Sequence, residues 1–200
     1  SPVRIASTIS IGVFVAVAAT VVAQRGGTSP GKPSDATARI VAAAQALLTT
    51  LDDAGRAKVQ FPFEGPQKTK WSNLPSPMYQ REGLRLADLT PAQRTAVNTL
   101  LSAALSSGGL RKVTDIMRGD EVLKTNAAGR GGGGARGGGG VIFGEAEYFL
   151  AFVVTPSVTT PWMLQFGGHH LAINLTMAGS QAPIANFDTI FPCVGPLGSR

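Results

Sequence analysis

The sequence predicts an α+β domain in which a helical N-terminal half packs on a mainly antiparallel sheet built from the C-terminal half. Apolar residues recur at three- and four-residue spacing through residues 34–123, as in amphipathic helices. They alternate with period two through residues 144–177, as in half-buried strands. The 200 residues, 44% of them hydrophobic and 15% charged, suffice for one domain with its own core.

The chain begins with an apolar run that is typical of a signal peptide. Residues 1–23 contain a basic residue, then the apolar run, then small residues that suit cleavage before Gln24. We therefore expect an exported protein, periplasmic or extracellular, with no stable membrane insertion after cleavage. The alternative is a retained anchor formed by residues 5–23. Residues 24–33 predict a flexible lead-in, and residues 34–200 a single domain.

Helices are expected in four places of the N-terminal half. Ser34 or Asp35 suits the cap of a helix that continues to residue 51, and the acids at 52–53 open a helical turn that reaches Val59. Thr90 and Pro91 suit the cap and first position of another helix, which the residues at 106–109 should end. A last amphipathic helix is expected over residues 110–123.

Residues 61–79, with four prolines and a glycine, predict an ordered but irregular segment. Two interpretations remain open for it, a functional loop and a crossover that is pinned to the core. Its aromatic and apolar side chains are the expected pins: Phe61, Phe63, Trp71, Leu74 and Met78.

The formal charge of +6 and the isoelectric point near 10.0 raise the question of a nucleic-acid partner. The basic residues are scattered and few aromatic residues are placed to stack on bases, so we expect no nucleic-acid binding. Residues 129–140, GRGGGGARGGGG, contain only two arginines and predict a mobile loop. The single cysteine, Cys193, excludes an internal disulfide framework.

Both histidines of the chain lie in residues 161–179, PWMLQFGGHHLAINLTMAG, between two runs of alternating apolar residues. The Gly167-Gly168 pair predicts a bulge or a tight turn. If the register of the second run extends back through the histidines, His169 belongs to its apolar face and His170 to the polar face with Asn174. We expect His169 to be structural and His170 to face a cleft, and both can bind one metal ion only if a bulge reorients one of them.

Two carboxylates are expected near these histidines. Residues 144–155 predict a strand on which Glu145 and Glu147 project from one side at the start. The functional hypothesis makes His170 a metal ligand or general base, with His169 as a further ligand, Glu145 or Glu147 as carboxylate partner, and Asn174 as an orienting group. The cofactor would be a divalent transition metal whose identity these donors do not specify. The alternative is a buried His169 and a surface His170 without such a role.

Several stretches resemble a largely bacterial family of exported proteins, domain of unknown function 3500. They are LDDAGRAKVQFPFEGPQKTKWSNLP, REGLRLADLTPAQR, FGEAEYFLAF and PWMLQFGGHHLAINLTMAG, within residues 36–182. The resemblance implies that Trp71 and Arg81 line the same cleft. Family members continue beyond a chain of this length, and residues 186–200 do not resemble them. The resemblance therefore implies an incomplete C-terminal part, and two interpretations stay open for the last residues, Cys193 included: a fragment in the native frame and a frame-shifted end.

These observations lead to two hypotheses of function. The first is an exported metal-dependent enzyme of unknown substrate with a site of histidine and glutamate residues. The alternative is a non-catalytic exported module that binds a small molecule, peptide or glycan through the aromatic loop. The motifs of serine hydrolases, phosphate-binding loops, dinucleotide-binding folds and HExxH metalloproteases are absent from the sequence.

Overall fold

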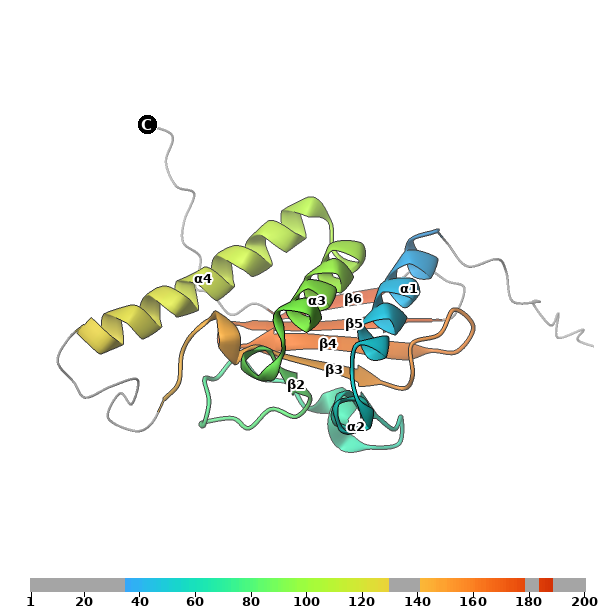
Figure 1. The fold of residues 1–200 in the computed structure, drawn as a ribbon, viewed down its shortest axis with the longest axis horizontal. Coiled ribbons are helices and arrows are strands. Elements are labelled where there is room, and N and C mark those ends of the chain that lie inside the picture. Colours follow the sequence, from blue (N-terminus) through green and yellow to red (C-terminus); the bar gives the residue numbers. More distant parts are fainter. Residues whose placement is uncertain (1–34, 130–140, 179–183, 189–200) are drawn as a thin grey trace, which may run out of the picture.

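The computed structural model describes residues 35–129, 141–178 and 184–188, and it confirms the predicted fold class (Figure 1). Helices cover one face of a six-stranded sheet, and most of the sheet comes from the C-terminal half. The expected signal peptide or anchor, the lead-in, Cys193 and all of the glycine-rich loop except Gly129 lie outside the described residues. Within the described ranges, no helix is long and apolar enough to span a membrane.

The helices begin where the sequence supplies caps. The carboxylate of Asp52 accepts a hydrogen bond from the Gly55 N–H, 2.8 Å away, at the start of its helix. Thr90 and Gln93 form a capping box in which each side chain binds the other residue's N–H. The α-helices of the described residues are α1 (Asp35–Thr49), α2 (Asp53–Val59), α3 (Pro91–Ala104) and α4 (Ser107–Gly129).

Residues 106–109 begin a helix as well as follow one. Helix α3 ends before them, as expected, but the hydroxyl of Ser106 accepts a hydrogen bond from the Gly109 N–H at 3.1 Å and so caps α4. The two glycines at 108 and 109 are therefore in the first turn of α4. This helix continues past Gly119 to Gly129, beyond the expected end at residue 123.

The sheet has the strand order β1-β3-β4-β5-β6, with β2 also paired to β3. The β1–β3 pair is parallel and the other pairs are antiparallel. The strands are β1 (Gln60–Phe61), β2 (Leu84–Arg85), β3 (Phe149–Val153), β4 (Trp162–Gly168), β5 (Leu171–Met177) and β6 (Ile184–Asp188). Short 3-10 helices are η1 (Pro66–Thr69), η2 (Leu86–Asp88) and η3 (Glu145–Glu147).

The strand expected from residue 144 begins only at Phe149, and this expectation was wrong for the two glutamates. Glu145 and Glu147 lie in η3. Gly144, with φ +133°, turns the chain against α4, where an added Cβ would lie 2.8 Å from the Glu121 carboxylate. The Glu145 N–H also donates to that carboxylate, so α4 rather than the sheet holds this segment.

The core lies between the sheet and helices α1 and α3, which pack against each other. Alternate positions of the central strands face these helices, because paired residues of neighbouring strands share a face of the sheet. The buried residues of this face include Leu150, Phe152, Trp162, Leu164, Phe166, Ile173 and Leu175. The helices contribute Ile40, Val41, Ala44, Leu47, Val97, Leu100 and Leu101.

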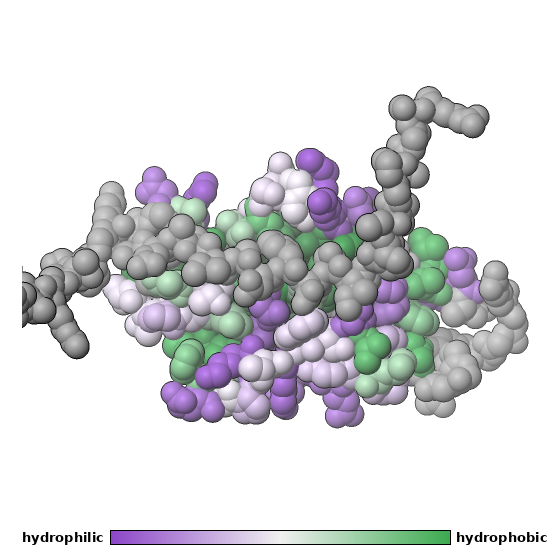
Figure 2. Space-filling view, turned by 180° about the vertical axis from the view of Figure 1, so that it is seen from behind, coloured by the Kyte–Doolittle hydropathy of each residue, from purple (hydrophilic) through white to green (hydrophobic). Residues whose placement is uncertain are grey.

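The irregular segment covers part of the opposite face of the sheet, but not through the expected apolar pins. Phe63, Trp71, Leu74 and Met78 are exposed, and only Phe61 is half-buried, in β1. The contact is polar instead: buried Gln67 donates from Nε2 to Gln165 Oε1 at 3.0 Å. The sheet positions beneath the segment are mostly small or polar, Ala151, Gln165, Gly167, Ala172 and Asn174, and offer the apolar side chains little to pack against. Seen from that side, the molecule mixes hydrophilic areas with separate hydrophobic patches (Figure 2).

Candidate functional site

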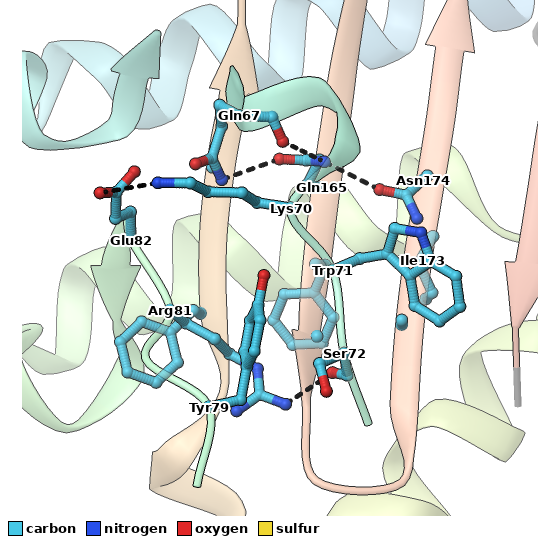
Figure 3. A pocket seen from close by; sticks show the side chains of 15 residues that line it. Gln67, Lys70, Trp71, Ser72, Tyr79, Arg81, Glu82, Gln165, Ile173 and Asn174 are labelled. Carbon is cyan, nitrogen blue, oxygen red and sulfur yellow. Dashed lines mark hydrogen bonds and ion pairs between the residues drawn. The ribbon is translucent and has the colours of Figure 1, made fainter. Parts of the chain in front are cut away.

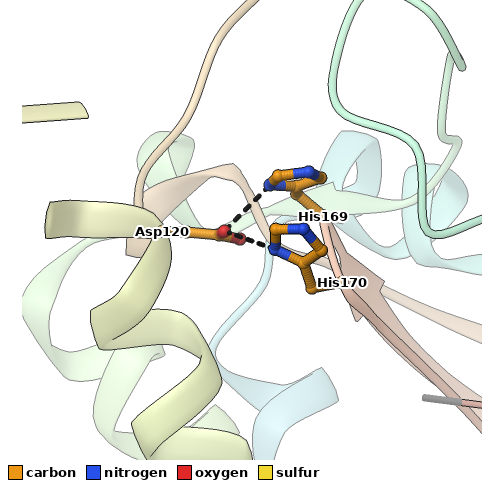
Figure 4. A group of neighbouring side chains, drawn as sticks. All are labelled: Asp120, His169 and His170. Atoms are coloured by element: carbon orange, nitrogen blue, oxygen red, sulfur yellow. Dashed lines mark hydrogen bonds and ion pairs between the residues drawn. The ribbon is translucent and has the colours of Figure 1, made fainter. Parts of the chain in front are cut away.

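His169 and His170 form the two-residue turn that joins β4 to β5, since Gly168 already pairs with Leu171. The expectation that strand alternation separates the two imidazoles was therefore wrong. His170 adopts a left-handed backbone with φ 62°, which breaks the alternation. Both imidazoles then turn toward the same carboxylate (Figure 4).

The two glycines lie at the end of β4, next to the turn rather than in it. Their close contacts explain why they lack side chains. A Cβ on Gly168 would lie 2.8 Å from the Tyr148 ring, and one on Gly167 would lie 2.7 Å from the Leu171 carbonyl oxygen. The glycines thus let a buried tyrosine and the start of β5 approach the turn.

Helix α4 places Asp120 against the histidine turn, and this side chain is only 1% exposed. Its Oδ1 atom lies 2.9 Å from Nδ1 of His169 and 3.1 Å from Nδ1 of His170 (Figure 4). The sequence interpretation missed this residue. A signal existed, because Asp120 follows Val113, Ile116 and Met117 at helical spacing and so places an acid on the apolar face of α4.

Tyr148 holds the other oxygen of this carboxylate. Its hydroxyl donates to Asp120 Oδ2 at 2.7 Å and lies 2.6 Å from the His169 carbonyl oxygen, so one hydrogen serves two acceptors. The ring is fully buried and stacks on Phe166 with centroids 5.8 Å apart. Burial, followed by the neighbouring Asp120, raises the pKa of Tyr148 well above its usual value, so the phenol stays a donor even in alkaline solution where an exposed tyrosine ionises.

Arg81 ties the irregular segment to the other side of the histidine turn. Its Nη2 donates to three carbonyl oxygens, those of Ser72, Leu74 and Gly168, at 2.6–2.7 Å. The His170 N–H donates to the Asn73 carbonyl at 3.1 Å. Burial lowers the pKa of Arg81, and the nearby Tyr79, Tyr148 and Asp120 oppose that shift. The turn is thus fixed from both sides.

The three other predicted cleft residues, Trp71, Arg81 and Asn174, line one small hollow (Figure 3). The hollow lies between the irregular segment and the sheet face that points away from α1 and α3, and its water-accessible volume is about 40 Å³. Asn174 therefore does not orient His170. Its side-chain oxygen accepts a hydrogen bond from Gln165 Nε2 at 3.0 Å instead.

Neither predicted glutamate reaches the histidines, because η3 directs both of them elsewhere. Glu147 forms a two-pronged ion pair with Arg85, whose pKa is raised by that hydrogen bond. Glu145 lines a separate groove of about 290 Å³ between α3 and α4, together with Arg94 and Thr114. The carboxylate partner of the histidines is Asp120.

Asp120, His169 and His170 form a group that is suited to hold a metal ion. Each offers one ligand atom, and these atoms all lie within 4.8 Å of one another. The two Oδ1–Nδ1 separations, 2.9 and 3.1 Å, fit adjacent ligands of one ion, because bonds of ~2.1 Å at right angles put neighbouring donors ~3 Å apart. The same separations also fit hydrogen bonds from both Nδ1–H groups to the carboxylate.

Comparison with known protein families assigns the chain to a family but not to a function. The family model described as Protein of unknown function (DUF3500) matches residues 33–186. The chain belongs to this DUF3500 family. Its match includes Asp120, the histidine turn and the whole hollow, so both sites lie in the part that defines a DUF3500 protein. No curated protein and no solved structure matches the chain.

Proposed function

We propose that the protein is a metal-dependent enzyme whose divalent transition metal ion is bound by Asp120, His169 and His170. One observation carries the proposal. Two imidazoles from a turn and one carboxylate from a separate helix, 49 and 50 residues away in sequence, meet at a single oxygen atom. No other histidine exists in the chain.

The burial of Asp120 supports the same conclusion. A carboxylate that is 1% exposed has lost most of its hydration, and nearby donors or positive charges must offset that loss. Tyr148 supplies one donor, and Arg81 lies close enough to act on it electrostatically but not within ion-pair distance. A bound cation would supply the missing charge at Oδ1.

The ligand set favours a catalytic rather than a purely structural ion. Two nitrogens and one oxygen from the protein leave positions open for water and substrate, whereas structural zinc sites usually have four protein ligands. Such an ion makes bound water acidic enough to serve as a nucleophile near neutral pH. His170, with 28% of its side chain exposed, gives the site a connection to solvent.

We further propose that the protein acts outside the cytoplasm, in the periplasm or the extracellular space. The support is the arrangement in residues 1–23 of a basic residue, an apolar run and small residues before Gln24. An assay of the cell fractions, with the processed N-terminus sequenced, tests this localisation.

Metal analysis tests the proposed ion. The protein should carry an affinity tag without histidine, so that its two native histidines are the only ones present. We expect about one bound metal ion per chain after incubation with Zn²⁺, Fe²⁺, Co²⁺ or Ni²⁺ and dialysis. Asp120→Asn and His170→Ala should lose the ion, and Asp115→Asn, an exposed acid on the same helix, should keep it.

Cobalt spectroscopy then separates a catalytic site from a structural one. The visible spectrum of the Co²⁺-loaded protein should change when azide is added, because an open position accepts the anion. A spectrum that azide leaves unchanged would refute the catalytic assignment. Normally folded wild-type protein that binds none of these ions stoichiometrically would refute the metal site itself.

A further inference from the structure

The hollow behind the sheet exists because three neighbouring positions of its floor carry almost no side chain. Ala151, Gly167 and Ala172 lie on adjacent strands, and Gly167 pairs directly with Ala172. The irregular segment spans this gap without filling it. A volume of about 40 Å³ holds roughly three waters at ~10–15 Å³ each, which is the size of one three-atom group such as a carboxylate.

The hollow carries an uncompensated positive charge. Lys70 and Glu82 on its rim neutralise each other across 3.2 Å. Arg81 has no carboxylate within ion-pair distance among the described residues, and its Nη2 contacts only neutral carbonyls. Its Nη1 is buried and has no hydrogen-bond partner in the described part of the chain. A buried guanidinium in this state favours an anionic partner.

Asn174 offers a second donor on another side of the hollow. Gln67 donates to Gln165 Oε1, and Gln165 Nε2 donates both to the Gln67 carbonyl and to Asn174 Oδ1 (Figure 3). This chain of bonds fixes the Asn174 amide with its oxygen occupied. The N–H groups of that amide are the part of Asn174 that can donate to a ligand in the hollow.

Two aromatic rings lie on either side of the hollow (Figure 3). Trp71 is 43% exposed, an unusual state for so large a side chain beside a polar pocket. The Tyr79 ring lies over the guanidinium, 5.4 Å from Arg81 Cζ. Rings in these positions offer stacking area to the part of a ligand that does not fit inside.

From these observations we propose that the hollow binds the carboxylate group of a small organic acid, with Arg81 and Asn174 as donors and Trp71 contacting the organic part. Tyr79 is the cover that such a ligand displaces to reach Nη1 of Arg81. The hollow shares no lining side chain with the metal site, and binding there does not require a bound metal ion. A free small acid and the C-terminus of a peptide share this chemistry.

Titrations followed by Trp71 fluorescence test the site, because the other tryptophan, Trp162, is buried in the core. The probes are benzoate and its neutral counterpart benzamide, at fixed ionic strength and with a chelator present so that no metal ion contributes. Benzoate should bind at least about tenfold more tightly than benzamide, the ratio that ~1.4 kcal/mol of charge recognition produces. Equal binding of the two, or no binding of benzoate, overturns the proposal.

A charge substitution locates the binding. Asn174→Asp keeps the shape of the side chain and its oxygen toward Gln165, but it adds a negative charge beside the ligand. It should weaken benzoate binding at least about tenfold, whereas Asn98→Asp, an exposed position on α3, should leave it unchanged. Unchanged benzoate binding by Asn174→Asp overturns the assignment.

Two further experiments show whether the natural ligand is a free acid or a peptide C-terminus, and whether the hollow works independently of the metal site. Tighter binding of N-acetylphenylalanine than of its amide and of benzoate identifies a peptide C-terminus, and preference for benzoate identifies a free acid. Asp120→Asn should bind benzoate at least as tightly as the wild type, because it removes a negative charge near Arg81 but no residue of the hollow, so that failure of the metal site and failure of this site are seen separately. Loss of benzoate binding in folded Asp120→Asn would contradict the independence of the two sites.

Discussion

Gly168→Ala should lower both the free energy of unfolding and the occupancy of the proposed metal site. The added Cβ would lie 2.8–2.9 Å from three atoms of the Tyr148 ring, closer than real Cβ contacts come. The ring is fully buried between β4 and the helices, so it cannot move without disturbing the core. Its hydroxyl fixes Asp120, and the displacement should therefore reach the carboxylate.

Two opposing effects set the magnitude. Alanine in a strand gains about 0.5–1 kcal/mol over glycine, and overpacking of a filled core costs about 1–3 kcal/mol. The difference between these ranges is about 0–2.5 kcal/mol, so the net loss of unfolding free energy should be about 1 kcal/mol. With an m-value of about 2 kcal/mol per molar urea, the midpoint should fall by about 0.5 M.

Gly119→Ala is the matched control, because it makes the same change on α4 next to Asp120. No atom lies within 4 Å of its added Cβ. This variant should gain about 0.5–1 kcal/mol from helix propensity and keep its metal ion. Urea unfolding followed by circular dichroism, with metal analysis of both variants, gives the comparison. A Gly168→Ala protein that is as stable as the wild type and loads metal equally would refute the reasoning.

Two further predictions concern a helix cap and the buried phenol. Thr90→Ala removes the capping box of α3 and should lower the unfolding free energy by about 1 kcal/mol in urea titrations, whereas Thr99→Ala within the helix should cost less. In a Tyr79→Phe variant the only phenol is that of Tyr148. Its pKa is raised in the folded protein, so in the unfolded chain the same phenol loses its proton at a lower pH, near pH 10. Stability should therefore fall as pH rises above that value. The absorbance change of ionisation should coincide with alkaline unfolding, and ionisation of the folded protein near pH 10 would contradict the buried hydrogen bond.

Local sequence patterns were sufficient to predict most of the fold. Thr90-Pro91 and Asp52 marked helix starts because capping depends on a few adjacent residues. Alternation identified β4 and β5, since each strand is paired on both sides and one face packs on the helices. The same alternation failed at His169 and His170, where the chain reverses and one residue takes a positive φ.

The candidate site was predicted only in half, because its other half depends on contacts that are distant in sequence. The histidines are adjacent and visible, but Asp120 reaches them through the packing of α4 against the turn. Glu145 and Glu147 were predicted as the carboxylate partners because they come just before β3, but they lie in η3 and do not contact the histidines. Trp71, Arg81 and Asn174 do share a hollow, yet its floor of alanine and glycine is set by strand register.

The backbone of His170 has a consequence for substitutions at this turn. A left-handed conformation costs a non-glycine residue about 1–2 kcal/mol, and glycine would adopt it without that strain. The turn thus holds a residue that is less stable there than the simplest substitute. His170→Gly should therefore relieve backbone strain at this turn while it removes one of the two imidazoles beside Asp120.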